Sequence, residues 1–208
     1  MWRAIWGGRF PRRTSRWSIS VRSRPLRSIS MAPDTTAPLP SLDTLCARFR
    51  ALGRDVLSQD VEARDKRGAE DSADWLPLWQ AAAEEGALRL VLPAAYGGYG
   101  LSVSDALRVL HALGEGCRDT GLLLALNGQL WAMQMSVYEF GSDAQKADWL
   151  PQLASGALIC AHAVTEDQSG SDVTGIRATA ARTADGYVLN GHKTWIGMAP
   201  AAHVGQVL

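Results

Sequence analysis

The stretch AVTEDQSGSDVTG, residues 163–175, decides how this sequence is interpreted. Acids, hydroxyls and a glycine follow an apolar run, and three small residues, Ser169, Gly170 and Ser171, stand in a row. Small residues let a backbone approach a phosphate closely, and hydroxyls and free N–H groups can bind one. The same composition also fits a strand that ends in a solvated surface turn. By itself the stretch leaves both interpretations open.

The composition is that of an ordinary globular protein, because 47% of the 208 residues are hydrophobic and 20% are charged. The net charge is zero, but eight of the 21 basic residues lie in the first 33 positions, which hold no acid. The rest of the chain therefore carries 13 basic against 21 acidic residues. Such a charge balance does not attract nucleic acid. No apolar run approaches the roughly 20 residues that span a bilayer, so no membrane span is predicted.

The basic arm at residues 1–40 is rich in Arg and Ser and is interrupted by Pro11 and Pro25. Three interpretations fit this arm. The translation start is placed too far upstream and Met31 is the true start, or the arm is an organellar transit peptide, or it is a nucleic-acid-binding arm. We prefer the first interpretation, which implies a cytoplasmic protein, whereas a transit peptide would imply the mitochondrial matrix. In every case we expect the arm to be disordered.

The next segment of the chain, residues 41–157, has the apolar spacing of helices. The expected helices span residues 42–56, 75–86, 102–116, 121–141 and 142–150. Gly86 is expected to end the second helix, and Ser142 with Gln145 forms a capping box for the fifth. The fourth is apolar almost all round, which is typical of a buried helix. The sequence therefore predicts an all-α domain here.

The remaining segment, residues 158–208, has the pattern of strands. A short apolar run ends near Thr165, and residues 178–196 predict a hairpin around Asp185-Gly186. The last eight residues look like a further strand. So few strands leave open edges and an uncovered face. We therefore expect an α+β fold: the helical domain, then the start of an antiparallel β-barrel-like middle domain, truncated.

Four stretches carry a family resemblance: PAAYGGYGLS (93–102), YEFGSDAQKADWLPQLASG (138–156), AVTEDQSGSDVTG (163–175) and GYVLNGHKTWIG (186–197). In order and spacing they resemble the acyl-CoA dehydrogenase family, continuously from about Ser41 to Leu208. The resemblance implies a helical domain, a middle β domain and a C-terminal four-helix bundle. It also implies FAD, bound between the β domain and the C-terminal helices.

The resemblance also implies which residues face the cofactor. The expected cofactor-binding residues are His162, Ala163, Val164, Thr165, Gly170, Ser171, Trp195, Ile196 and Gly197. Thr165 and nearby amides would donate hydrogen bonds to the pyrimidine side of the flavin, which stabilises the reduced ring. Gly170 and Ser171 would approach the pyrophosphate and the CoA arm, which makes Ser171 a substrate-binding residue too. Trp195 would pack against the flavin.

The implied activity is α,β-dehydrogenation of an acyl thioester, in which a glutamate removes the α-proton and the β-hydrogen leaves as hydride to the flavin. The expected substrate is acyl-CoA or another acyl thioester, and the electron acceptor is electron-transfer flavoprotein or oxygen. The helix at 121–141 would form one wall of an acyl channel. The full-length protein is expected to be a homotetramer or a dimer.

Two departures from the family pattern affect this expectation. Trp195-Ile196-Gly197-Met198 stands where members usually carry Trp-Ile-Thr-Asn, so the hydroxyl near flavin N5 is absent. No acid matches the catalytic glutamate, which belongs to a C-terminal domain that this sequence lacks, and we interpret Glu166 as structural. We therefore assign no catalytic residue and expect this chain alone to be an inactive fragment. A dehydrogenase of a carrier-protein-bound acyl or amino-acyl group, a flavin monooxygenase or nitroalkane oxidase, and a non-catalytic degenerate fragment stay open as alternatives.

Other candidate residues receive less specific interpretations. Cys46, Cys117 and Cys160 show no CxxC or ligand spacing, which indicates packing cysteines in a reduced, intracellular protein, and no metal site is predicted. Cys160 has no evident activating base. His111 is expected to be a partly buried packing residue. Arg177 and Lys193 could meet phosphates, but we interpret them as solvated strand charges.

Overall fold

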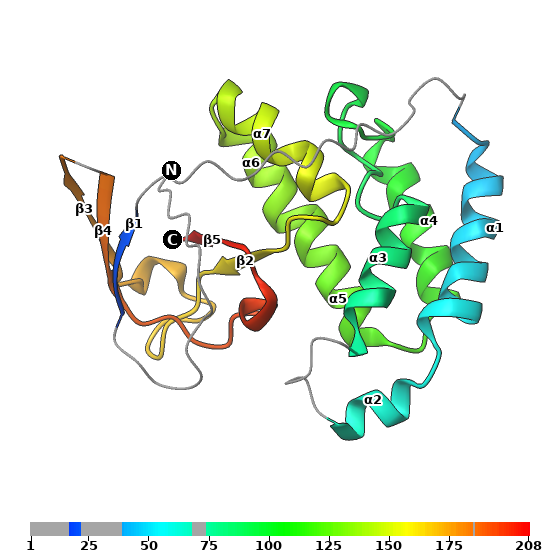
Figure 1. Cartoon of the computed structure of the whole chain (residues 1–208), viewed down its shortest axis with the longest axis horizontal. Coiled ribbons are helices and arrows are strands. Elements are labelled where there is room, and N and C mark those ends of the chain that lie inside the picture. The colour runs from blue at the N-terminus through cyan, green and yellow to red at the C-terminus, as the bar shows by residue number, and fades with distance from the viewer. Residues whose placement is uncertain (1–16, 22–38, 68–73, 185) are drawn as a thin grey trace. The chain divides into compact units, whose positions relative to one another are not determined.

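The computed structural model describes residues 17–21, 39–67, 74–184 and 186–208. The chain divides into two compact units, one helical, within residues 29–157, and one built from strands, with residues 158–208 (Figure 1). From Leu42 onward the helices are followed by strands, and this confirms the predicted α+β class. Among the described residues, no helix is both long and apolar enough to cross a membrane.

The helical unit contains more helical segments than expected. They are α1 (Leu42–Leu52), η1 (Gly53–Leu57), α2 (Val61–Arg67), α3 (Leu76–Glu85), η3 (Ala94–Tyr96), α4 (Val103–Gly116), α5 (Thr120–Asn127), η4 (Gly128–Gln134), α6 (Met135–Phe140) and α7 (Asp143–Ala154). The α-helix that the sequence did not predict is α2, because its sequence VEARDKR is charged and has no apolar period. The guanidinium of Arg64 fastens α2 to the start of α5, 2.8 Å from the carboxylate of Asp119.

The most extensive contact between two helices in the described part of the helical unit is between α1 and α4. A Cβ atom added to Gly116 would lie 2.2 Å from the carbonyl oxygen of Arg50, so only glycine allows this approach of the two backbones. The interior beside it is apolar and includes the buried Leu45, Phe49 and Leu113. The predicted first helix is confirmed, with a π-helical end at η1.

The local signals for helix ends are also confirmed. Gly86 ends α3 in the left-handed conformation with φ 100°, and the capping box of Ser142 and Gln145 begins α7. The predicted helix at 121–141 is continuous through α5, η4 and α6, but its middle is π-helical. Contrary to the expectation of a helix buried all round, Leu124 and Phe140 are exposed.

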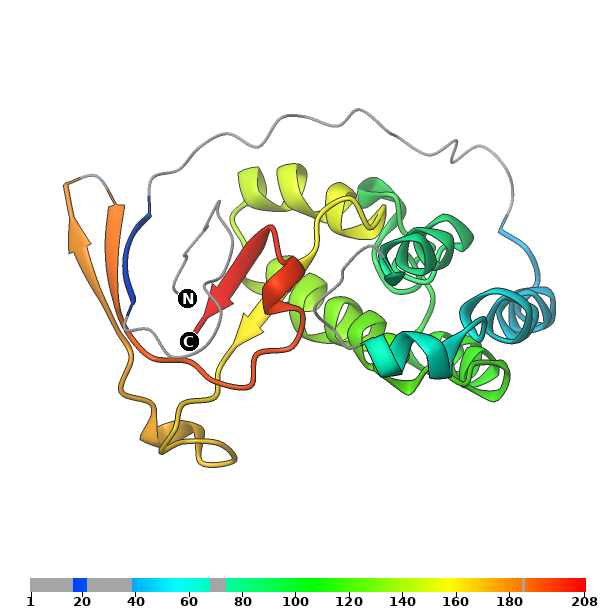
Figure 2. The same ribbon diagram turned by 60° about the horizontal axis from the view of Figure 1, so that its bottom comes forward.

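The β unit holds two small sheets (Figure 2). Its strands are β1 (Trp17–Val21), β2 (Cys160–Ala163), β3 (Thr179–Thr183), β4 (Gly186–Gly191) and β5 (Val204–Val207), with the short helices η5 (Val173–Gly175) and η6 (Ala199–Ala201). The predicted hairpin is confirmed as the antiparallel pair β3–β4, while Asp185 lies outside the described residues. The last predicted strand is β5, which pairs in parallel with β2 rather than antiparallel.

The basic arm contributes to the β unit, which was not expected. Its residues Trp17–Val21 form β1, which pairs antiparallel with β4 at the edge opposite β3. For these five residues, the expectation of a disordered arm is wrong. Apart from Leu39 and Pro40, the rest of the arm, including Met31, Pro11 and Pro25, lies outside the described residues.

Candidate functional site

Two stretches of the β unit that are far apart in sequence lie side by side where β2 and β4 end. The N–H of Thr194 donates to the carbonyl oxygen of Thr165 at 2.9 Å. The ammonium of Lys193 donates to the carbonyl oxygen of Val164 at 2.8 Å. One residue further out, Nδ1 of His192 lies 3.0 Å from the carboxylate of Asp167. We call residues 164–167 and 192–197 the junction; it unites two groups of residues that the resemblance assigned to the cofactor.

The junction contains hydrogen-bond donors that are unused. In the described part of the chain, the N–H groups of Val164 and Thr165 and the hydroxyl of Thr165 have no hydrogen-bond partner. Both residues are half-buried. Polar groups shielded from water are normally paired, so donors left free at such a position are available to a ligand.

The second half of the junction has an unusual backbone and an exposed aromatic ring. Trp195 is 90% exposed and has φ 57°, and Met198 has φ 63°. Left-handed backbone is uncommon for large side chains and is concentrated at ligand-binding and active sites. Gly197 is exposed, and a Cβ atom there would meet nothing within 4 Å. Ile196 is half-buried, and its carbonyl accepts from the N–H of Ala199.

Two expected cofactor-binding residues are instead occupied within the β2–β5 sheet. Ala163 is buried, and its carbonyl oxygen accepts from the N–H of Leu208 at 3.1 Å. His162 is half-buried, with Nδ1 2.8 Å from the side-chain oxygen of Gln206. They therefore support the start of the junction and have less to offer a ligand than Val164 and Thr165.

The turn of small residues, 169–171, has one buried residue and two exposed ones. Ser169 is buried, and its hydroxyl donates to the carbonyl oxygen of Asp172, so it is not available to a phosphate. Gly170 and Ser171 are exposed, and in the described residues their N–H groups have no partner. The hydroxyl and the N–H of Thr174 bind the carboxylate of Asp172 and lower its pKa. Only the outer two small residues could approach an anion.

Glu166 is a buried residue of the junction, and its carboxylate is fully engaged in hydrogen bonds. Its carboxylate accepts from the N–H groups of Arg177 and Ala178, both at 2.8 Å, from Lys193 at 2.9 Å and from the amide of Gln168. Burial opposes ionisation and would raise the pKa, but these hydrogen bonds together lower the pKa of Glu166 to about 2. Such a carboxylate is a poor base, which agrees with a structural role.

Lys193 was expected to be a solvated strand charge, and this interpretation is wrong. Its side chain is only 11% exposed because it reaches inward to Glu166. The two residues are 27 positions apart, so no local sequence signal could have paired them. Arg177, in contrast, is exposed, as expected, and contributes only its backbone N–H to the site.

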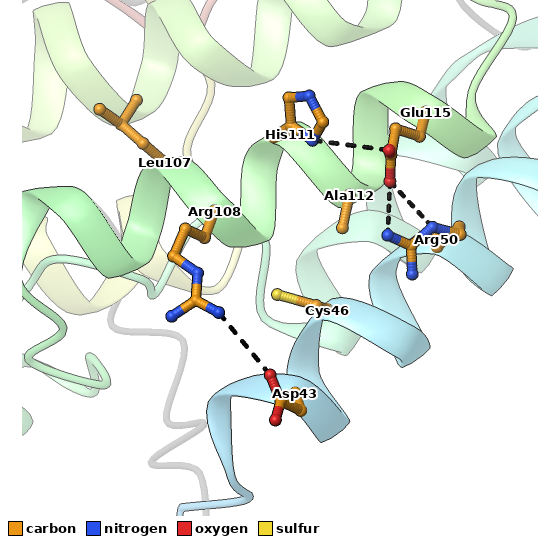
Figure 3. A pocket seen from close by; sticks show the side chains of 8 residues that line it. All are labelled: Asp43, Cys46, Arg50, Leu107, Arg108, His111, Ala112 and Glu115. Carbon is orange, nitrogen blue, oxygen red and sulfur yellow. Dashed lines mark hydrogen bonds and ion pairs between the residues drawn. The ribbon is translucent and has the colours of Figure 1, made fainter.

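A separate cavity of about 600 Å³ lies between α1 and α4 in the helical unit (Figure 3). Its lining residues are Asp43, Cys46, Arg50, Leu107, Arg108, His111, Ala112 and Glu115. The charges pair with one another, because Nε of Arg50 donates to Glu115 at 2.9 Å and Arg108 lies 3.7 Å from Asp43. The side chain of His111 is 76% exposed beside Glu115, so the expectation of a packing histidine is wrong. None of the expected cofactor-binding residues lines this cavity.

The cysteines show no sign of reactivity or of metal binding. Burial raises the pKa of Cys160 to about 12 and also raises the pKa of Cys117. Cys46 lines the cavity and is half-buried. Over the ranges that the structure describes, no group of histidine, cysteine and acidic side chains could hold a metal ion.

Comparisons with known proteins point to one family. Residues 41–157 match the acyl-CoA dehydrogenase N-terminal domain, and residues 161–208 match the acyl-CoA dehydrogenase middle domain. An L-prolyl peptidyl-carrier-protein dehydrogenase of Pseudomonas fluorescens is 41% identical over 127 residues, which are 61% of this chain and 33% of that protein. A (2S)-methylsuccinyl-CoA dehydrogenase of Cereibacter sphaeroides is 34% identical over an alignment of 175 residues, which covers 78% of this chain and 31% of that protein.

A solved structure, the FAD complex of PigA, is similar over 82% of this chain and 44% of its own, with 34% identity and a TM-score of 0.74. The chain thus spans about a third of the length of these curated relatives.

Proposed function

The chain belongs to the acyl-CoA dehydrogenase family, and from this premise we propose that it forms the flavin-facing wall of an FAD-dependent dehydrogenase that acts on an acyl thioester. The observation that carries the proposal is the junction. Its free donors at Val164 and Thr165 lie in the strand end that is bonded to Thr194, the residue before the exposed Trp195. Free donors next to an exposed aromatic face suit a planar, electron-rich heterocycle.

The residues present fit FAD. The N–H groups of Val164 and Thr165 and the Thr165 hydroxyl would donate to the pyrimidine side of the ring, and Trp195 would cover it. The free N–H groups of Gly170 and Ser171 would bind phosphate oxygens, in the open space that surrounds Gly170. When bound, FAD supplies the acceptor for the hydride that leaves the substrate. Electrons would then pass to an electron-transfer flavoprotein or to oxygen.

Gly197 stands where a threonine hydroxyl is usual in the family. Its exposed backbone offers only an N–H group as a donor at that position. A single backbone donor is sufficient to hold a ligand atom, although it lacks the reach of a side-chain hydroxyl. The site is therefore compatible with dehydrogenation, but it would offer one hydrogen-bond donor fewer near flavin N5 than a site with threonine at this position.

The substrate that we favour within this class is an amino-acyl group held as a thioester on a carrier protein. The Pseudomonas fluorescens relative is a dehydrogenase of a prolyl group on such a carrier. In addition, Gln134, in the segment that the resemblance assigns to the acyl channel, is fully buried, and neither atom of its amide is hydrogen-bonded. A buried amide without hydrogen-bond partners costs about 1–3 kcal/mol of free energy. A plain alkyl chain could not offset this cost, whereas a polar amino-acyl group could do so by hydrogen bonding to the amide.

The cofactor is tested by titrating the purified chain with FAD and following the flavin fluorescence. We expect a colourless protein as purified, because the junction contacts one side of the flavin, and saturable quenching once FAD is added in excess. Trp195→Ala should weaken binding about fivefold through the loss of ring packing. Phe140→Ala removes another exposed aromatic ring, in the helical unit, and should change nothing. The absence of quenching, or equal losses in both variants, would contradict the proposal.

The substrate class is tested by NMR titration with two thioesters, a prolyl group on a peptidyl carrier protein and butyryl-CoA. We expect the carrier-bound prolyl group to bind more tightly and to shift the side-chain amide resonance of Gln134. Gln134→Met should remove this preference because it removes the amide while keeping the side-chain length. Tighter binding of butyryl-CoA would favour a fatty acyl-CoA substrate instead.

A further inference from the structure

The buried ion pair of Glu166 and Lys193 lies directly beneath the free donors of the junction. The ammonium is 2.9 Å from the Glu166 carboxylate, and the side chains are 4% and 11% exposed. A lysine held in this way loses rotamer freedom and hydration. Replacing a buried pair by apolar residues often leaves stability unchanged or raises it. Stability alone therefore gives little reason for a lysine at this position.

The second contact of the ammonium fixes the orientation of one peptide group. Lys193 also donates to the carbonyl oxygen of Val164, at 2.8 Å. That oxygen and the N–H of Thr165 belong to the same planar trans peptide and point in opposite directions. Because Lys193 holds the oxygen, the N–H of Thr165 points away from the ammonium, and it is one of the free donors. The next peptide is held too, since the Thr165 carbonyl accepts from Thr194 at 2.9 Å.

The ammonium also changes the donor strength of this amide. A cation at a carbonyl oxygen draws electron density from the peptide group, which strengthens the hydrogen bond that its N–H can make. Glu166 keeps the ammonium in place and is itself fastened by the N–H groups of Arg177 and Ala178, where the chain enters β3. Glu166 thus anchors the lysine, and the lysine acts on the Thr165 amide.

We propose that Lys193, anchored by Glu166, is a positioning residue that orients and polarises the free amide of Thr165 toward an electron-rich ligand atom. The identification of this atom with the pyrimidine side of the flavin rests on the proposed function. A stronger donor favours a ligand most when the ligand carries negative charge. Lys193 would therefore favour the reduced flavin over the oxidised one.

The first test needs no flavin and uses Lys193→Met in this chain. We expect the Thr165 amide proton to shift upfield, because its peptide is no longer polarised. The Thr194 amide should exchange with solvent about tenfold faster, as its hydrogen bond to Thr165 loosens. Arg182→Met removes an exposed charge from β3 of the same unit and should leave both signals unchanged. Unchanged Thr165 and Thr194 signals in Lys193→Met would overturn the proposal.

A second variant separates positioning from stability. Lys193→Met leaves the Glu166 charge buried without its partner, which lowers the melting temperature. The double variant Glu166→Gln/Lys193→Met removes that charge and should recover most of the melting temperature. It should still show the shifted Thr165 resonance, because the ammonium is missing. A double variant that regains both the melting temperature and the original resonance would show that the pair acts on folding alone.

The third measurement adds FAD and compares its two redox states. Lys193→Met should weaken binding of the reduced flavin more than binding of the oxidised flavin, so the midpoint potential of the bound flavin becomes more negative. Arg182→Met should keep the original potential. Equal weakening of both states would overturn the polarising role. If the chain binds no FAD, the proposed function fails, and the two flavin-free measurements still decide the role of Lys193.

Discussion

The interface of α1 with α4 and the junction of the β unit use their polar groups in opposite ways. Between α1 and α4 the surface charges pair with one another, as in Arg50 with Glu115, and the interior is closed by close-packed backbones at Gly116. In the junction, donors at Thr165 stay free and Trp195 is exposed in a left-handed conformation. The comparison separates a region in which contacts are satisfied within the chain from one that is organised to receive a ligand.

The largest effect is expected from Gly116→Ala in the helical unit. The new Cβ would lie 2.2 Å from the Arg50 carbonyl oxygen, so α1 and α4 would have to move apart. We expect the free energy of unfolding to fall by about 3 kcal/mol, as for overpacked cores. Urea unfolding followed by circular dichroism measures this loss.

Gly114→Ala is the matched control for this prediction. Gly114 lies in the same helix, and a Cβ there would meet nothing within 4 Å. Since alanine is the better helix former, this variant should stabilise the chain by up to about 1 kcal/mol. Similar losses in both variants would mean that helix propensity, and not the approach of α1 to α4, determines the effect.

The next effect concerns acid and the β unit. The pKa of Glu166 is about 2 in the folded state, compared with an ordinary value of 4.5. A carboxyl group with a lowered folded pKa stabilises the fold while it is ionised, so its contribution is complete above pH 4.5 and is lost as the pH falls toward 2. We expect the unfolding free energy to decrease through this window, and Glu166→Gln should remove most of that decrease.

Asp172→Asn provides the comparison in the acid experiment. The pKa of Asp172 is also lowered, through the hydroxyl and the N–H of Thr174, but this carboxylate is exposed. Its hydrogen bonds compete with water, so its removal should flatten the pH dependence much less than Glu166→Gln does. Amide resonances of the β3–β4 hairpin, recorded from pH 6 to pH 2 in roughly half-unit steps, would report both effects. Equal slopes in the two variants would contradict the dominance of Glu166.

The smallest effect on stability is expected from Gly197→Thr in the junction. No atom lies within 4 Å of the new Cβ position, and the backbone there is not left-handed. The unfolding free energy should therefore change by less than about 0.5 kcal/mol. Binding of FAD should become tighter, because the threonine adds a hydroxyl donor. A large loss of stability would show that Gly197 is packed as tightly as Gly116, and the contrast between the two regions would fail.

Local signals in the sequence predicted much of the fold. The cap at Ser142 and the helix stop at Gly86 depend on groups within a few positions of each residue, so both could be predicted correctly. The hairpin of β3 and β4 was predicted for the same reason. The helix α2 was missed because its charged sequence has no apolar period and is held by the distant Asp119.

The candidate site was predictable as a set of residues but not as an arrangement. The family pattern at residues 163–175 and the stretch around Trp195 indicated the two halves of the junction. The sequence did not indicate that Ser169 turns inward or that Lys193 is buried. Both depend on hydrogen bonds to partners that come close only when the chain folds. The residues next to Ser169 and Lys193 in the sequence therefore do not indicate that these side chains are buried.

The sequence by itself determined the general succession of helices and then strands from Ser41 onward, the helix end at Gly86, the helix start at Ser142 and the family, because these depend on short patterns and on residue types at fixed spacing. The tertiary structure alone decided that β5 pairs in parallel with β2 and that Lys193 reaches Glu166 and Val164. It also left His111 exposed and the amide of Thr165 free. The physical reason is that burial and pairing depend on segments that meet only when the chain folds.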